Sequence, residues 1–265
     1  MQVNYSRRLA WLRNRDEVTL SPASKALLVY GALMCIALGL TYLYSLGDER
    51  TLREVGIWNK PMKFMAATTV FAWTTVWVTH LANAAVTHGR AYKGIGALLL
   101  ATSLFEVAYI SYQAANGSAS HYNTSDLWHA LLFGLMAIAA VGLTATQGWL
   151  AWEIWKARGT GGLSVTAWAV VIGLTLTFVL STVSGFLLGG NQPQAGPGLT
   201  LVGWHLQNDI RPSHFLGVHA QQFIPLLGVL AIRFAGIYQR PILAAGSSVY
   251  VLAWGVLTWA GLSIH

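Results

Sequence analysis

Seven long apolar blocks, separated by short polar connectors, constrain this chain more than any other feature of its sequence. A helix that crosses the hydrocarbon layer of a membrane needs about 20 consecutive, mostly apolar residues. Only 9% of the residues are charged, whereas soluble domains carry about a quarter. The sequence therefore predicts an all-α, polytopic membrane bundle with seven transmembrane helices. The expected spans are 26–47, 61–86, 92–115, 126–155, 163–189, 213–236 and 241–263.

The segments outside these blocks are short, with two exceptions. Residues 1–25 form a basic tail, and we expect the rest of the chain, 26–265, to be one helical bundle. The connector at about 190–212 contains several Gly and Pro residues and is long for a structureless loop, which predicts a lid or cap. The run 181–190 places small residues on one helix face, which favours close helix packing.

Lys and Arg are divided unequally between alternate connectors, and this predicts the orientation of the chain. Eleven of the 16 basic residues share one side with the N-terminal tail, and five lie on the other side. Because cytoplasmic connectors carry an excess of Lys and Arg, we expect the N-terminus inside and the C-terminus outside. Membrane lipids are the expected partners. Nucleic acid is not, because the net charge of +7 is scattered over the helix ends.

Glu106 is the least expected residue in the third span. It lies about nine residues from the external end, hence on the order of 13 Å deep at 1.5 Å per residue. An ionisable side chain at that depth is costly unless it is paired, protonated or bound to a cation, and it marks a functional site. Gln113 lies two turns further along the same face.

The sixth span begins with RPSHFLGVHAQQ, in which two histidines and two glutamines fall within one half of the helix. We expect these side chains to point into the bundle and to meet Glu106 across the interface between the third and sixth spans. The same external half holds five of the eight histidines, which are His121, His129, His205, His214 and His219.

This gathering of imidazole and carboxylate groups predicts a metal-dependent membrane enzyme, with redox or hydrolytic chemistry. Zinc, iron and copper are the metals that such ligands bind in the absence of thiolates. Glu106 and His219 are the candidate catalytic residues, and the substrate class is a lipid or a quinone-like molecule. The expected ligands are Glu106, His121, His214 and His219, with Gln113, Asp209 and Gln222 as their hydrogen-bond partners.

Two alternatives remain open. In the first, His129 and His219 are the axial ligands of one haem b, and Lys63 and Arg211 contact its propionates. In the second, the protein is a transporter or lipid-binding module in which Glu106 is the proton or cation site. Lys60 is interpreted as an interfacial residue whose ammonium group reaches water. The sequence is compatible with an oligomer.

Three short elements carry a resemblance to a known group of proteins. These are WNKPMKF at 58–64, SHYN at 120–123 and DIRPSHFLGVHAQQFIPL at 209–226. They resemble an uncharacterised family of bacterial multi-pass integral membrane proteins. The resemblance implies a location in the bacterial inner (cytoplasmic) membrane and no particular activity.

Overall fold

The structure of the protein is a computed structural model that describes residues 20–196 and 202–263. These residues form seven long α-helices, and the all-α prediction is confirmed. Each helix begins and ends within a few residues of an expected span. The predicted N-terminal tail lies almost entirely outside the described residues. The helices are α2 (Pro22–Ser45), α3 (Asn59–Asn83), α4 (Arg90–Ala115), α5 (Leu127–Lys156), α6 (Val165–Gly189), α7 (Arg211–Phe234) and α8 (Gln239–Ser263).

Six of the described helices are long and apolar enough to cross a membrane, as expected for an integral multi-pass membrane protein. The exception is α3, which has 25 residues but a more polar sequence. It packs against α2, α4, α5, α6 and α7, so it occupies the interior of the bundle. A helix surrounded by other helices meets less lipid and tolerates more polar side chains.

The threonines of α3 illustrate how those polar side chains are accommodated. The hydroxyl groups of Thr68, Thr75 and Thr79 each donate a hydrogen bond to a carbonyl oxygen four residues earlier, at 2.8, 2.8 and 2.6 Å. Because no water is present in the hydrocarbon layer, a hydroxyl there must find a protein acceptor. The helix itself provides one for each of these three side chains.

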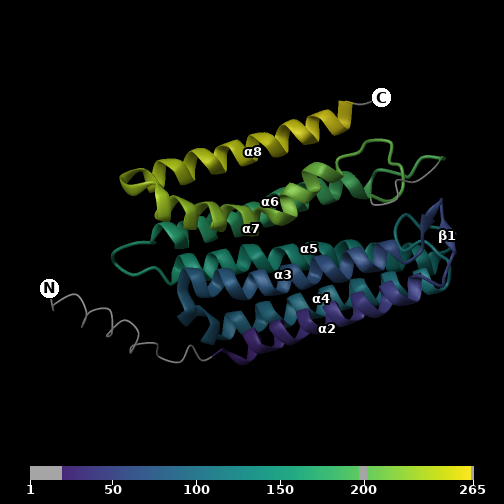
Figure 1. The fold of residues 1–265 in the computed structure, drawn as a ribbon, viewed down its shortest axis with the longest axis horizontal. Helices are drawn as coiled ribbons and strands as arrows, with labels where there is room; N and C mark the ends of the chain where they lie inside the picture. Colours follow the sequence, from purple (N-terminus) through teal and green to yellow (C-terminus); the bar gives the residue numbers. More distant parts are fainter. Residues whose placement is uncertain (1–19, 197–201, 264–265) are drawn as a thin grey trace.

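The helices are arranged in two groups, which Figure 1 shows side by side. The first group contains α2, α3, α4 and α5, and the second contains α6, α7 and α8. Contacts of α5 and α3 with α6, and of α3 with α7, join the groups. Two helical turns, η1 (Ala84–His88) and η2 (Gly236–Tyr238), connect neighbouring helices at one end of the bundle.

A small β-hairpin lies at the opposite end, which we call the hairpin end. Strands β1 (Thr51–Leu52) and β2 (Val55–Gly56) pair antiparallel, and the connectors 116–126 and 190–210 lie at the same end (Figure 1). Both turn residues, Arg53 and Glu54, have positive φ angles of 52° and 61°. This conformation twists the backbone in the sense that two-residue hairpins require, although Gly and Asn usually supply it. Neither turn position holds Gly or Asn, so the sequence alone does not predict the hairpin.

Helices α6 and α7 pack closely against each other. A Cβ atom on Gly217 would lie 2.8 Å from the backbone nitrogen of Ser181 and 2.9 Å from the backbone carbon of Leu180. A Cβ atom on Gly228 would lie 2.4 Å from the Cβ of Ala169. Ser181 is buried against α7, so the predicted close packing is confirmed at the start of the run 181–190, whereas a Cβ on Gly189 or Gly190 would meet nothing within 4 Å.

We expect Gly217→Ala to destabilise the protein by about 1–3 kcal/mol, because the added methyl group has no space and the neighbouring atoms belong to the backbone. Gly134→Ala is the matched control, since a Cβ there meets nothing within 4 Å. The control should be neutral or stabilising by up to about 1 kcal/mol. Thermal unfolding of the purified variants tests this. Equal midpoints for the two variants would contradict the close approach of α6 and α7.

Candidate functional site

Lys60, in the first turn of α3, is the centre of the candidate site. Its ammonium group interacts electrostatically with Glu106 on α4 and with His121 in the α4–α5 connector. It also lies 5.7 Å from the centroid of the Trp204 ring. Glu106 is only 4% exposed, and its Oε1 atom has no hydrogen-bond partner among the described residues. The structure therefore brings a buried carboxyl group and a cation together.

The hydroxyl group of Tyr30 lies within electrostatic range of Glu106, and two further hydroxyl groups lie beside it. Tyr30 comes from α2, Thr68 from α3 and Ser103 from α4, and all three side chains are buried. The Tyr30 hydroxyl lies beside the other two and within electrostatic range of Glu106, but it completes no hydrogen bond in the described part of the chain. Thr68 and Ser103 donate to carbonyl oxygens one turn earlier in their own helices, at 2.8 and 2.6 Å. Their oxygen atoms therefore remain able to accept further hydrogen bonds.

Four cations converge at the hairpin end, and we call them the basic cluster. Its members are Arg53, Lys60, Lys63 and Arg211. The Arg53 guanidinium lies 4.9 Å from the Trp204 ring centroid. Lys63 Nζ and Arg211 Nη1 both donate to the Val202 carbonyl, at 3.1 and 3.0 Å. Because α3 and α7 both begin here, their N-terminal dipoles add to a potential that attracts anions.

Two of the residues expected to support metal ligands have other partners. Asp209 forms an ion pair with Arg211, at 2.6 Å between Oδ2 and Nη2. The hydrogen bond from that guanidinium lowers the pKa of the Asp209 carboxyl. Gln113 is buried and donates through Nε2 to the Tyr109 hydroxyl, at 3.1 Å. Asp209 therefore anchors the basic cluster, and Gln113 packs within α4.

The two histidines of α7 face different neighbours. His214 Nδ1 lies 2.9 Å from the Ser184 hydroxyl of α6. The imidazole of His219 packs against Phe215 with the rings tilted by 43° and 4.2 Å between their centroids, and it also interacts with the Gln222 side chain. Both histidines are half-buried. The prediction that the polar residues of α7 point into the bundle is confirmed most clearly for Gln221, which is fully buried.

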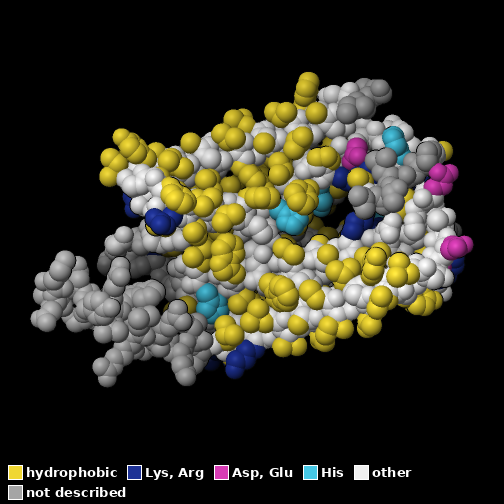
Figure 2. All heavy atoms as spheres, viewed as in Figure 1, with side chains coloured by type: hydrophobic (Ala, Val, Ile, Leu, Met, Phe, Trp, Pro, Cys, Tyr) yellow, Lys and Arg dark blue, Asp and Glu magenta, His cyan; other side chains and the backbone are white. Residues whose placement is uncertain are grey.

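A hollow lies between α3 and α7 at the hairpin end. Figure 2 shows the surface recessed there, beside histidine side chains in cyan and basic side chains in dark blue. Gln222 Nε2 donates to Thr74 Oγ1, at 3.1 Å. Gln222, the third residue expected to support a metal ligand, thus joins α7 to α3.

The four expected metal ligands do not lie together. Glu106 interacts with Lys60, His214 with Ser184, and His121 Nδ1 lies 3.2 Å from the Ser120 hydroxyl. Within 20–196 and 202–263, no three side chains of His, Cys, Asp or Glu are close enough to share a metal ion. Glu106 on α4 was expected to contact the histidines of α7. Instead, α3 packs against both α4 and α7. No metal-dependent step follows from this arrangement.

The expected haem ligands are also apart. His129 lies in the first turn of α5, where Asp126 caps the helix and bonds both the backbone N–H and the Nδ1 of His129, at 2.9 and 2.6 Å. These hydrogen bonds lower the pKa of Asp126. Helix α6 packs against both α5, which carries His129, and α7, which carries His219. Lys63 and Arg211 do lie together, in the basic cluster.

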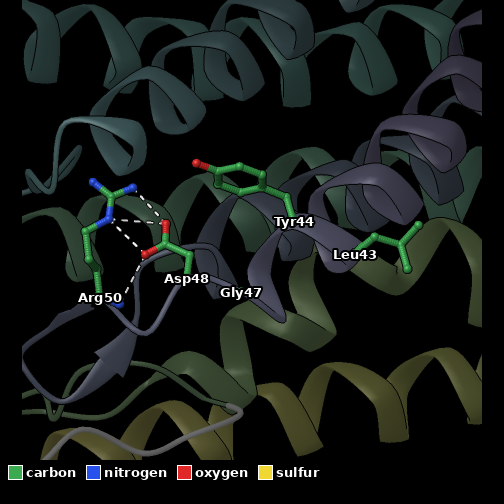
Figure 3. Close-up of a pocket in the computed structure, with 5 residues that line it drawn as sticks. All are labelled: Leu43, Tyr44, Gly47, Asp48 and Arg50. Carbon is green, nitrogen blue, oxygen red and sulfur yellow. Dashed lines mark hydrogen bonds and ion pairs between the residues drawn. The ribbon is translucent and has the colours of Figure 1, made fainter.

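A second polar depression, at the C-terminal end of α2, has a structural explanation (Figure 3). The Asp48 carboxylate pairs with the Arg50 guanidinium at 2.7 Å. This contact lowers the pKa of the Asp48 carboxyl group. Arg50 Nη1 also donates to the Ala115 carbonyl at the end of α4, at 2.9 Å. The ion pair thus ties the α2–β1 connection to α4. The residues that line the depression are Leu43, Tyr44, Gly47, Asp48 and Arg50.

Sequence interpretation missed the role of Lys60 and the contribution of Trp204. The available signal was that Lys60 and Lys63 are three residues apart in the first turn of a helix, and so lie on neighbouring positions of one face. Trp204 carries no signal in the sequence, because its contacts depend on how residues 190–196 and 202–210 are arranged. A bridge between Pro193 and Leu206 joins these two segments.

Comparison of the chain with protein families, with curated proteins and with solved structures finds no match in any of the three.

The environment of His121 makes a pH dependence of stability predictable. Burial lowers the pKa of His121 well below its usual range, and the nearby Lys60 ammonium lowers it further. In the unfolded chain a histidine binds a proton below about pH 6.5. The unfolded state therefore binds more protons between the lowered value and about 6.5, and stability falls as the pH falls through that window.

We expect His121→Gln to lose less stability than the wild type when the pH is lowered from about 7.5 to about 5.5. The difference should be at most about 1.4 kcal/mol for each pH unit below about 6.5. Unfolding midpoints of the detergent-solubilised proteins at both pH values test this. Parallel pH profiles would show that His121 titrates alike in the folded and unfolded states.

Proposed function

We propose that this protein is a seven-span inner-membrane protein that binds an organic anion at the hairpin end and takes up a proton on Glu106 when it does so. The observation that carries the proposal is the interaction of Lys60 with the buried Glu106 carboxyl group inside the basic cluster. Of the sequence-based alternatives, it develops the transporter or ligand-binding module with Glu106 as the proton site.

Anion binding and proton uptake are coupled because the ligand and the Glu106 carboxylate compete for the same cation, Lys60. Before the ligand binds, Lys60 offsets the charge of Glu106. A carboxylate, sulfonate or phosphate that enters the basic cluster competes for the same ammonium group, because charge-assisted hydrogen bonds to such anions are strong. Glu106 then lacks its counter-cation in a desolvated place, where the charged form is disfavoured, and it takes up a proton. One anion and one proton are bound together, and the site gains no net charge.

The hollow between α3 and α7 supports an amphipathic ligand. Basic side chains lie beside it (Figure 2), and Phe215, near the start of the same helix α7, is 53% exposed. An anionic group with an apolar body fits such a place, because the charge contacts cations while the body stays among apolar side chains. The anion is either a free molecule or the headgroup of an anionic lipid, and the two sources share this chemistry.

The proton coupling is testable with benzenesulfonate, an anion that remains ionised near neutral pH and carries no exchangeable proton of its own. We expect its binding to the protein in phosphatidylcholine nanodiscs to be accompanied by uptake of about one proton per anion, by the exchange of ion pairs described above. An indicator dye in weakly buffered solution measures the uptake. Lys60→Met should weaken binding roughly tenfold or more, because it removes a charged hydrogen-bond donor.

Glu106→Gln should bind the anion without proton uptake, since an amide does not titrate. Glu153→Gln is the control, because Glu153 pairs with Lys156 at 3.2 Å at the other end of the bundle. Phosphatidylglycerol nanodiscs distinguish the ligand sources, since a lipid headgroup in the site would compete with benzenesulfonate. Undiminished proton uptake by Glu106→Gln, or no anion binding by the wild type, would refute the proposal.

The proposal also requires that α3 is the seventh span and that the hairpin end faces the periplasm. Contacts of α3 with five other helices support the first requirement, and the excess of Lys and Arg at the other end supports the second. We expect a cysteine at Ser118, introduced after Cys35→Ala has removed the only native cysteine, to react with an impermeant thiol reagent on intact spheroplasts. Labelling only after lysis would mean the reverse orientation.

A further inference from the structure

A layer of uncharged polar side chains crosses the middle of the bundle, at a greater depth than the Lys60–Glu106 pair. We call it the polar layer. Its members are Thr74 and Thr75 on α3, Gln147 on α5, Thr177 on α6, and Gln221 and Gln222 on α7. Three hydrogen bonds link these helices: Gln147 Nε2 to Thr75 Oγ1 at 3.4 Å, Gln221 N to Thr177 Oγ1 at 2.8 Å, and Gln222 Nε2 to Thr74 Oγ1 at 3.1 Å.

Four amide atoms of the polar layer are buried and have no hydrogen-bond partner among the described residues. They are Oε1 of Gln147, Oε1 of Gln222, and both Oε1 and Nε2 of Gln221. Gln147 and Gln221 are fully buried. Polar groups in protein interiors are nearly always partnered, because an unpartnered one costs free energy. Three of the four atoms are oxygens, so the layer offers more acceptors than donors.

A proline adds a further acceptor next to Gln221. Pro225 lacks an N–H, so the backbone carbonyl of Gln221, four residues earlier, loses its helical donor. Helix α6 packs closely on this part of α7, since a Cβ on Gly173 would lie 2.8 Å from Pro225 Cδ and 3.0 Å from the Ala220 carbonyl oxygen. Thr177 is one turn further along α6. Gln221 therefore presents a side-chain oxygen and a backbone oxygen at a bend that α6 holds in place.

We infer that the polar layer binds a monovalent alkali cation, with sodium as the expected ion, centred on Gln221 and Gln222. Amide, hydroxyl and carbonyl oxygens are the ligands of hard cations. In membrane transporters the carbonyls of interrupted helices bind sodium in the same way. Calcium and magnesium usually require carboxylates, and the described part of the layer contains none. Water carried by the ion accepts the hydrogen bond that Gln221 Nε2 offers.

This inference does not rest on the proposed anion site. The two sites use different residues, and one is charged whereas the other is neutral. If the protein failed to bind benzenesulfonate, the cation site would be unaffected.

Thermal unfolding in equal concentrations of sodium, potassium and choline chloride tests the inference. We expect sodium to raise the midpoint of the wild type by roughly 2–4 °C or more over choline, because an ion that binds only the folded state stabilises it. Gln221→Leu should lose this response. In choline it should be at least as stable as the wild type, because a leucine of similar size leaves no unpartnered amide.

Thr69→Val is the matched control. Thr69 is buried on another face of α3, where its hydroxyl donates to the Gly31 and Met65 carbonyls at 3.2 and 2.9 Å. This variant should keep the full response to sodium. Thr177→Val is the second test variant, in case Gln221→Leu does not fold, and it should reduce the response. Equilibrium dialysis with radioactive sodium should find one ion per wild-type protein.

Equal midpoints of the wild type in all three salts would overturn the inference and leave ordered water as the occupant of the polar layer. An undiminished sodium response in both Gln221→Leu and Thr177→Val would also overturn it, because the ion would then bind elsewhere. A response to potassium as large as that to sodium supports the site and widens its selectivity.

Discussion

The absence of water from the hydrocarbon layer is the constraint on which the rest of this structure depends. Each polar side chain inside the bundle needs a partner from the protein itself. The threonines of α3 find theirs in the carbonyls of their own helix. Glu106 finds a cation that reaches it from another helix. The side-chain amides of Gln147 and Gln222 are only partly satisfied, and both side-chain amide atoms of Gln221 lack a partner among the described residues.

The helices were predictable because length and hydropathy alone define a transmembrane segment, and both can be read in the sequence. Helix α3 is the instructive case. Its position matched the expected second span, but the sequence did not reveal that it lies at the centre of the bundle. The β-hairpin was not predictable, because Arg53 and Glu54 adopt a turn conformation that their residue types disfavour. The structure at that turn depends on contacts with Trp204 and Pro193, which are distant in the sequence.

The sequence predicted which residues belong to the candidate site better than it predicted which of them contact one another. The depth of Glu106 identified it as a functional residue, but its partner depends on the order in which helices pack, which one sequence does not give. The expected Glu106–histidine contact fails because α3 occupies the place between α4 and α7. The haem hypothesis pairs His129 with His219, which is far away in the sequence. In the structure His129 bonds the helix-capping residue Asp126, three residues away. Local partners of this kind compete with every long-range hypothesis.

The glycine contacts between α6 and α7 have a mechanical consequence. Two helices whose backbones touch cannot slide or separate without losing that contact, so α6 and α7 must move as one stiff body. The contact of α3 with α7 is of a different kind, since a side-chain hydrogen bond from Gln222 to Thr74 joins these two helices. A movement of α7 relative to α3 would therefore carry α6 with it, and the packing of α6 on α5 would have to change as well.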